Sequence, residues 1–468
     1  MLETENRLQF LSHINNGRGN GFPIVSTVFY KLHDPTSLEV DVLLLGDEDL
    51  RKAALIHLTR PPYYDQICLE SDEPRFSSVE VLGIQQISNR EYRISFSASE
   101  VQIGLKHNVS DQETTWFLKG ELTPSGILEE VGIKHYSYTG DIKFERLESS
   151  KVELSTSFGL VEVGERYVHY EDEEFANKVT HSIQRASITG LIKIPSGESL
   201  ANVNDLLKRE LADVCLILSF CHRQPVSVYQ IEYITDPNTT PRELMHTATV
   251  RRRRLELEGK IHQDELIDRD NLTNGGLNEL LDKYRRSTYR EELKRTIRFL
   301  AASYKITTLE SSYFLAYSAL DLITSAVRSE DVFLMDNAKW RRIQKSLRQF
   351  IDSIAVTEGL APVVNQLKEK LPELRRTSGV TRIIKACNHL AIETSDLWRK
   401  EGFEAGLRSA TKIRDSLFHA ASVGEIDDMW VDLIRIRVLV ERLVLGALGW
   451  PDNRTWVWKN QQLARIRQ

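Results

Sequence analysis

The sequence predicts an α+β multidomain protein, in which an N-terminal antiparallel β-sandwich or barrel-like domain precedes a C-terminal all-α helical bundle. Two patterns lead to this fold class. Up to about residue 195, short runs rich in Val, Ile, Tyr, Phe and Thr alternate apolar and polar residues, as half-buried strands do. From about residue 277, apolar residues recur at helical spacing instead. With 468 residues, each half is long enough to bury a core of its own.

The expected strands are separated by Gly, Pro, Asn and Asp. The clearest lie at 23–30, 40–45, 92–97, 114–119 and 187–194. They follow one another with too little helix between them for a parallel sheet with crossover helices, so we expect antiparallel pairing.

One helix interrupts this β-rich region. Between Leu200 and Cys221 apolar residues share one helical face, Gln224-Pro225 ends the pattern, and residues 226–234 return to a strand. We expect this helix to pack on the sheet and to close an N-terminal regulatory or sensor domain, residues 1–235. Residues 236–276 are polar and predict a charged linker. Its run Arg251-Arg252-Arg253-Arg254 is a solvated segment or, alternatively, a contact to a nucleic-acid backbone.

Residues 277–468 predict a helical bundle, because apolar stripes alternate with connectors of moderate length. Pro372 is expected to kink or end one helix, and Gly449 and Pro451 end the last. The expected helices are 277–286, 290–327, 339–355, 360–375, 381–398, 403–421 and 429–448.

Charge divides the chain. Residues 1–250 hold 23 Lys and Arg against 37 Asp and Glu, a net of −14, whereas residues 251–468 hold 38 against 30, a net of +8. The sum of −6 therefore hides an acidic half and a basic half. This split is typical of a nucleic-acid-facing module joined to a domain that recognises a trigger or restrains the module.

Cysteine usage and hydropathy predict a cytoplasmic protein. Cys68, Cys215, Cys221 and Cys387 show no metal-ligand spacing and no disulfide framework, so we expect buried thiols and no metal. The N-terminus lacks a secretory signal, and no apolar run approaches the roughly 18 residues that span a bilayer. Phosphate-binding loops, serine elbows and His-Glu-x-x-His patterns are absent from the sequence, and we expect no cofactor.

The stretch Ile413–His419 combines helical context with groups suited to chemistry on RNA. Arg414 is a planar cation that fits a phosphate, and His419 can carry a proton near neutral pH. Only here does an acidic residue follow the Arg within a helical run that ends at a polar break, 422–428. Similar spacings occur without this context at Arg7/His13, Arg51/His57 and Arg382/His389.

Helix geometry limits how Arg414 and His419 can cooperate. Five residues on a regular helix place them about 140° apart around the axis. Either the helix unwinds at Ala420 to Val423, or two copies of the helix meet across a twofold axis and share a cleft. Asp415, four residues before His419, lies on the same face and is expected to accept a hydrogen bond from the imidazole.

Such a site can cleave RNA without a metal. His419 would take a proton from the 2′-hydroxyl or give one to the leaving 5′-oxygen, while Arg414 stabilises charge on the phosphate. The expected products carry a 2′,3′-cyclic phosphate and a 5′-hydroxyl.

With these residues the C-terminal half resembles a HEPN domain (higher eukaryotes and prokaryotes nucleotide-binding). Arg414, Asp415 and His419 match the Arg, polar residue and His of its ribonuclease members. The segment 309–323 is similar to the family's early helix, which often carries an acidic residue after Ala-Leu; here that residue is Asp321, where Glu is more usual.

The order of β-rich domain, linking helix and bundle resembles the ApeA-like proteins of bacterial anti-phage defence. This resemblance implies cleavage of cellular RNA such as tRNA in abortive infection. From the helix geometry we expect a homodimer formed through the bundle, and from the acidic N-terminal domain a role in sensing a phage-derived trigger.

Other residues are candidates for substrate binding. Lys412 neighbours the motif and can reach a phosphate. Arg382 and His389 lie one helix earlier and are expected to line the same groove, unless His389 is a core residue. Glu310 and Asp321, eleven residues apart, share a helix face that either approaches the cleft or is a solvated acidic surface.

Two alternatives remain open from the sequence. The C-terminal tail interleaves Trp450, Trp456 and Trp458 with cations, as single-stranded nucleic-acid surfaces do, but a tail packed on the bundle explains the tryptophans too. A non-catalytic HEPN-type module that binds RNA, nucleotide or protein, with Arg414 as a ligand contact, is the alternative to a nuclease.

The Arg414 motif also has an interpretation without any function: a surface Arg followed by a helix-end His, neither of which binds a ligand.

Overall fold

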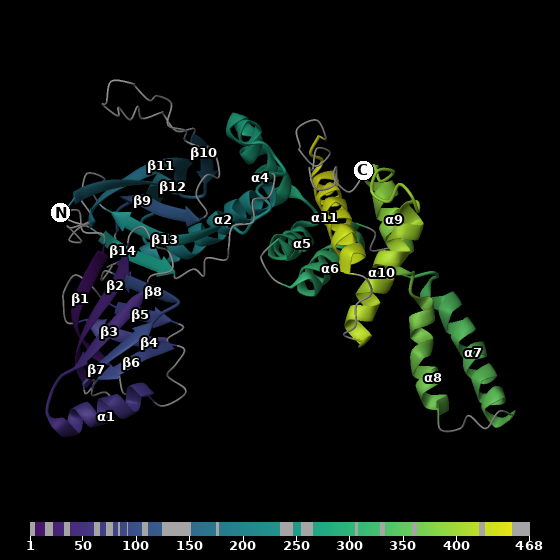
Figure 1. The fold of residues 1–468 in the computed structure, drawn as a ribbon, viewed down its shortest axis with the longest axis horizontal. Helices are drawn as coiled ribbons and strands as arrows, with labels where there is room; N and C mark the ends of the chain where they lie inside the picture. The colour runs from purple at the N-terminus through teal and green to yellow at the C-terminus, as the bar shows by residue number, and fades with distance from the viewer. Residues whose placement is uncertain are drawn as a thin grey trace. The chain divides into compact units, whose positions relative to one another are not determined.

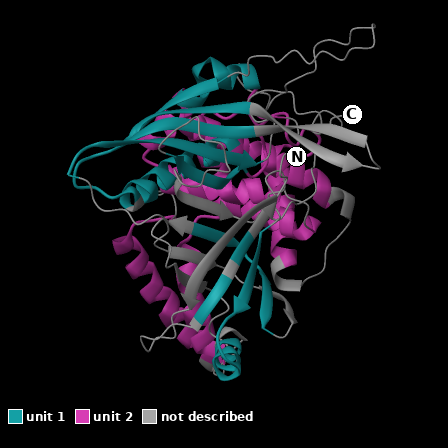
Figure 2. Ribbon diagram, turned by 90° about the vertical axis from the view of Figure 1, so that its left-hand side faces the viewer, with its two compact units in different colours: residues 1–218, 226–260, 269–278 teal, residues 219–225, 261–268, 279–468 magenta. Residues whose placement is uncertain are grey.

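The computed structural model places two compact units, which Figure 2 shows in different colours. Unit 1 contains residues 1–218, 226–260 and 269–278, and unit 2 contains residues 219–225, 261–268 and 279–468. Element labels are those of Figure 1. The residues that the structure describes are 5–14, 22–31, 38–59, 66–71, 78–82, 85–90, 92–104, 111–123, 151–174, 177–234, 247–253, 265–304, 308–327, 333–357, 363–420 and 426–451.

Unit 1 is built from antiparallel strands. In the described part they pair in the order β10-β11-β12-β9-β13-β14-β8-β5-β4-β1-β2-β3-β7-β6, so β14 joins two groups of strands. The strands are β1 (Glu5–Ile14), β2 (Phe22–Lys31), β3 (Glu39–Leu44), β4 (Gln66–Ser71), β5 (Ser78–Leu82), β6 (Gln85–Arg90), β7 (Arg93–Ser97), β8 (Glu100–Gly104), β9 (Thr114–Thr123), β10 (Lys151–Thr156), β11 (Gly159–Glu174), β12 (Asn177–Ile194), β13 (Ser227–Ile234) and β14 (Thr247–Arg253).

Alternating side chains explain why these segments form strands. In β3, Val40, Val42 and Leu44 are buried while the residues between them are half-buried or exposed. Because side chains of a strand point alternately to the two faces of a sheet, one face of β3 enters the core. The expectation of an antiparallel, β-rich N-terminal half is confirmed.

The predicted linker, 236–276, is wrong in part, because it contains β14. This strand pairs with β13 on one side and with β8 on the other. Arg251, Arg252 and Arg253 all have partners in the register, at Gln102, Val101 and Glu100 of β8. A run of arginines is therefore compatible with a strand. Residues 235–246 and 254–264 lie outside the described residues.

Helix α1 (Glu48–Thr59) was not expected from the sequence. Asp47 begins it, because its Oδ1 accepts a hydrogen bond from the Leu50 amide at 2.9 Å, and Glu48 and Asp49 lie in the first turn. Acidic residues in that turn interact favourably with the helix dipole. Helix α2 (Leu200–Cys221) has the bounds that its apolar period predicts.

The C-terminal half is helical, as expected. Its helices are α3 (Arg269–Asn271), the π-helix η2 (Leu272–Gly276), α4 (Leu277–Arg286), α5 (Arg290–Ser303), α6 (Leu309–Val327), α7 (Asn337–Thr357), α8 (Val364–Lys370), the 3-10 segment η5 (Leu371–Arg375), α9 (Gly379–His389), α10 (Phe403–Ala420) and α11 (Ile426–Leu448).

Two long predicted helices are shorter in the structure. The expected helix 290–327 divides into α5 and α6, because Thr308 caps a new helix and its Oγ1 accepts a hydrogen bond from the Ser311 amide at 3.3 Å. The expected helix 381–398 ends at His389, where Ala391 takes a positive φ of 53° and turns the chain. Pro372 ends α8 as predicted, since the chain continues from there as η5.

Helix α11 forms the core of unit 2. Leu433, Ile436, Leu439, Val440 and Leu443 are fully buried. Because a helix that is apolar on most faces needs neighbours around it, α11 packs against α5, α6 and α10.

A buried ion pair fixes the turn after α2 to α11. Arg223, at a positive φ of 51°, donates from Nε and Nη2 to the two carboxylate oxygens of Glu441 at 2.6 and 2.8 Å. Tyr304 also donates its hydroxyl to Glu441, and burial raises the pKa of that hydroxyl, so it remains a donor. The Arg437 guanidinium lies 4.5 Å above the Tyr304 ring, and burial lowers its pKa to about 10.

Cys215, Cys221 and Cys387 are buried thiols, as expected from the sequence. Burial raises the pKa of Cys215 and of Cys387 to about 12, so these thiols are protonated and unreactive at neutral pH. The side chain of Cys68 lies outside the described residues.

Glu441→Gln should lower the free energy of unfolding by about 3 to 5 kcal/mol, because it leaves Arg223 buried without its counter-ion. Urea denaturation followed by circular dichroism measures this loss. As a control, Arg286→Gln breaks an exposed pair with Asp282 and should cost less than about 1 kcal/mol. Equal losses in the two variants would contradict the structural role of the buried pair.

Candidate functional site

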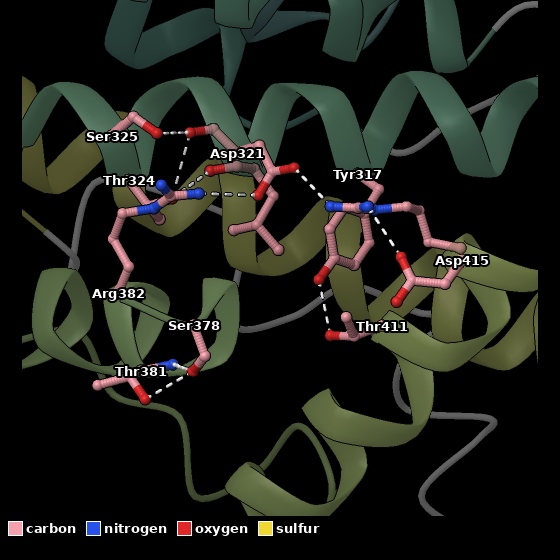
Figure 3. Close-up of polar contacts among 11 residues, drawn as sticks. Tyr317, Asp321, Thr324, Ser325, Ser378, Thr381, Arg382, Thr411 and Asp415 are labelled. Atoms are coloured by element: carbon pink, nitrogen blue, oxygen red, sulfur yellow. Dashed lines mark hydrogen bonds and ion pairs between the residues drawn. The ribbon is translucent and has the colours of Figure 1, made fainter. Parts of the chain in front are cut away.

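The candidate site lies where α6, α9 and α10 meet in unit 2 (Figure 3). Tyr313, Tyr317 and Asp321 follow one another at four-residue steps on α6, so they share one face of that helix. Helix α10 packs against them with Leu407 and Ala410, both fully buried. The small side chain of Ala410 leaves its carbonyl accessible, and this carbonyl accepts a hydrogen bond from Tyr313 Oη at 2.8 Å.

Arg414 of α10 has three described contacts. Its Nη2 donates to Asp321 Oδ2 at 3.0 Å, and its Nη1 donates to Asp415 Oδ1 at 2.8 Å. Its Cζ lies 4.9 Å from the centroid of the Tyr317 ring, within range of a cation–π interaction. Carboxylates from two helices and one aromatic ring therefore fix the guanidinium.

Asp321 also binds a second arginine. Arg382 Nη2 of α9 lies 3.5 Å from Asp321 Oδ1, while Arg414 uses the other oxygen (Figure 3). Burial raises the pKa of the Asp321 carboxyl, although the two guanidinium groups act to lower it. The charged carboxylate is thus stabilised by two cations against the cost of desolvation.

The Tyr317 hydroxyl is hydrogen-bonded to Thr411 of α10. The two hydroxyl oxygens are 2.7 Å apart, and Thr411 Oγ1 donates its proton to the Leu407 carbonyl at 2.7 Å. Tyr317 is therefore the donor of the shared hydrogen bond. Burial raises the pKa of Tyr317 to about 12, which keeps this donor protonated at neutral pH.

The cluster is open to solvent on one side. The Arg414 side chain is 29% exposed, and Asp415 is 51% exposed. A guanidinium has more N–H donors than the two hydrogen bonds to Asp321 and Asp415 use. An oxyanion that reaches this surface can therefore bind Arg414 while the carboxylates keep it in place.

The structure brings together four of the predicted residues: Asp321, Arg382, Arg414 and Asp415. Glu310 does not join them. It is exposed, and eleven residues place it about 16 Å along α6 from Asp321. Its role in substrate binding therefore has no support in the geometry.

Two further candidates lie away from Arg414. Lys412 is exposed, and two residues of helix turn it about 160° away from Arg414 around the axis of α10. His389 is exposed at the end of α9, so the interpretation as a core histidine is wrong. Neither residue has a described contact with Arg414.

His419 lies in the last turn of α10, and its side chain is outside the described residues, as are those of Trp456 and Trp458. Its hydrogen bond to Asp415 stays a prediction. The helix continues through Ala420. The rest of the range in which the helix was expected to unwind, up to Val423, lies outside the described residues, so this alternative stays a prediction. Trp450, by contrast, is 3% exposed and belongs to the core.

Sequence reasoning missed Tyr313, Tyr317 and Thr411. The first two lie in the segment that resembles the family's early helix, and their four-residue spacing from Asp321 was the available signal. Thr411 gave no signal, since its partner lies 94 residues away in the sequence.

Comparisons with known proteins identify no relative: no family model, no curated protein and no solved structure matches the chain. Within the residues that the structure describes, no three His, Cys, Asp or Glu residues gather in a way that would hold a metal ion. No helix in that part of the chain is long and apolar enough to cross a membrane.

A double-mutant cycle on Asp321→Ala and Arg414→Ala should give a coupling energy of about 1 kcal/mol or more, because the pair is less than one-third exposed and bridges two helices. Urea denaturation of the two single variants and the double variant measures this coupling. The exposed pair Glu404/Arg408 within α10 is the control and should give about 0.3 to 0.5 kcal/mol. A coupling no larger than the control would mean that Asp321 does not hold Arg414.

Proposed function

We propose that this protein is a metal-independent endoribonuclease of the HEPN type. It acts as a homodimeric, cytoplasmic effector of anti-phage defence that cleaves cellular RNA. The observation that carries the proposal is the contact between Arg414 Nη2 and Asp321 Oδ2 at 3.0 Å.

This contact joins the two segments on which the resemblance to HEPN domains rests. Arg414 comes from the ribonuclease-like motif, and Asp321 is the acidic residue of the early helix. They lie 93 residues apart in the sequence, and long-range packing brings them together. Their meeting in the fold supports a common site.

In the proposed reaction each residue of the site has its own role. Arg414 binds the scissile phosphate and stabilises the charge that develops on it. His419 moves the proton of the 2′-hydroxyl or of the leaving 5′-oxygen. Asp321, Arg382 and Tyr317 are positioning residues, because they fix the guanidinium of Arg414 from α6 and α9.

The positions of Arg414 and His419 around the axis of α10 support a dimer. The helix is continuous from Arg414 through His419, which places the two side chains about 140° apart around its axis. A second copy related by a twofold axis can present its His419 to the Arg414 of the first. In this arrangement neither copy has a complete site alone.

The acidic unit 1 is proposed to sense a phage-derived trigger. It contains most of residues 1–250, whose net charge is −14, and the basic residues are concentrated after them. A negative field of this kind can compete with RNA for a basic surface until a trigger binds.

One observation favours the alternative of a non-catalytic binding module. The formal charges of Arg382, Arg414, Asp321 and Asp415 sum to zero, so the cluster attracts a phosphate weakly through charge alone. In such a module Arg414 is a ligand contact, and loss of His419 has no consequence for binding.

Wild-type protein should cleave total cellular RNA in excess EDTA and leave 2′,3′-cyclic phosphate and 5′-hydroxyl ends, since His419 moves the protons and no metal takes part. His419→Ala should lose cleavage by a factor of about 100 or more and keep RNA binding. Gel analysis of the RNA, with end-group labelling, measures both results.

Lys385→Ala is a suitable control, because Lys385 is exposed on α9 and has no proposed role in the reaction. It should cleave as the wild type does. A His419→Ala variant that cleaves at the wild-type rate would overturn the nuclease proposal, whereas RNA binding that depends on Arg414 without any cleavage would support the binding module.

A further inference from the structure

Helix α7 is the most basic helix of the described part of unit 2. Between Asn337 and Thr357 it contains five cations and one acidic residue, Asp352. The cations are Lys339, Arg341, Arg342, Lys345 and Arg348. All five are exposed, whereas Trp340 of the same helix is buried.

Three of the cations share one face. At about 100° per residue, Arg341, Lys345 and Arg348 fall within roughly 60° of one another around the axis, and Arg342 lies beside them. Trp340, Leu347 and Ile354, which are buried or half-buried, lie about 110° to 150° from the middle of this face, and the exposed Ile343 and Phe350 lie opposite it. Helix α7 packs against α8 and η5, and Figure 1 shows α7 and α8 side by side. We call Arg341, Lys345 and Arg348 the basic face.

Carboxylates do not neutralise this face. Asp352, the acidic residue of α7, is paired with Lys368 of α8 at 2.5 Å. Asp336, just before the helix, is paired with Lys339 at 3.6 Å. Among the described residues, no carboxylate lies within ion-pair distance of Arg341, Lys345 or Arg348.

We propose that the basic face of α7 binds the phosphate backbone of single-stranded RNA. Unpaired cations on an exposed helix face complement the charge of a polyanion, and their binding to it releases counter-ions. This inference rests on the proposed function in one respect: the RNA that α7 binds is taken to be the RNA that the Arg414 site cleaves.

The spacing of the face fits a polymer better than a single anion. From Arg341 to Arg348 the helix rises about 10 Å, a length that covers about three phosphates of a stacked strand. The near-neutral Arg414 cluster has little long-range attraction for RNA, so α7 supplies the binding energy that the cleavage site lacks. Affinity and chemistry are thus carried by different helices.

The test uses the full-length chain in a His419→Ala background, which prevents cleavage, and a fluorescent single-stranded RNA oligonucleotide. The triple variant Arg341→Gln, Lys345→Gln, Arg348→Gln removes three positive charges and keeps good helix formers. Its affinity at 0.1 M salt should fall on the order of 100-fold. The slope of log K against log salt should shrink by about 2, since each cation that no longer neutralises a phosphate reduces it by about 0.7.

The control is a second triple variant with the same change of charge: Lys52→Gln, Lys193→Gln, Arg286→Gln. Each of these cations is exposed and already paired with a carboxylate. The control should bind RNA with the affinity and salt slope of the parent. If circular dichroism shows that the α7 triple variant is unfolded, the three single variants replace it, each with a slope smaller by about 0.7.

An α7 variant that binds RNA as the parent does, or a control that loses as much affinity, overturns the inference. Binding of the parent to anionic phosphatidylserine vesicles but not to RNA also overturns it and assigns the face to a membrane surface. The failures are distinguishable: if the wild type binds RNA through α7 without cleaving it, the proposed nuclease fails and this inference stands. If the wild type cleaves RNA and the α7 charges do not change KM, the proposed nuclease stands and the inference about α7 fails.

Discussion

The carboxylate of Asp321 is the interaction on which the candidate site depends. It lies on α6 and binds one arginine from α9 and one from α10, so a single side chain links three helices. Arg414 in turn rests on the Tyr317 ring, which is fixed by a hydrogen bond to Thr411 of α10. A guanidinium held by so many partners loses little entropy when it binds an anion, and this preorganisation is what a phosphate-stabilising group requires.

The same rigidity imposes a second constraint. Because α10 is helical from Phe403 through Ala420, Arg414 and His419 lie about 140° apart around its axis. In the proposed function a second copy supplies the histidine, which would link activity to association. Charge differs between the two surfaces. Carboxylates balance the cluster around Arg414, whereas among the described residues no carboxylate lies within ion-pair distance of the basic face of α7. In the proposed function the Arg414 cluster positions a phosphate, and the basic face of α7 attracts the RNA.

The sequence predicted those parts of the fold that a regular pattern encodes. Helices α2 and α4 have their expected bounds because their apolar stripes are continuous. The break between α5 and α6 was missed because the apolar period continues on both sides of Thr308, and only its capping hydrogen bond marks the new helix. Likewise β14 is held by pairing with β13 and β8, which no local pattern reveals. In the site, Asp321 and Arg414 were predicted individually, but their contact and the role of Tyr317 depend on long-range packing.

The central claim is that Arg414 of one copy and His419 of another form the cleavage site, and a mixing experiment tests it most directly. Arg414→Ala and His419→Ala are each inactive in this account, but a dimer that contains one copy of each has one intact site. After subunit exchange, an equimolar mixture should recover about a quarter of the wild-type rate of RNA cleavage, because half of the dimers are mixed and each of these has one of two sites. A mixture as inactive as either variant, although the subunits have exchanged, would contradict the account.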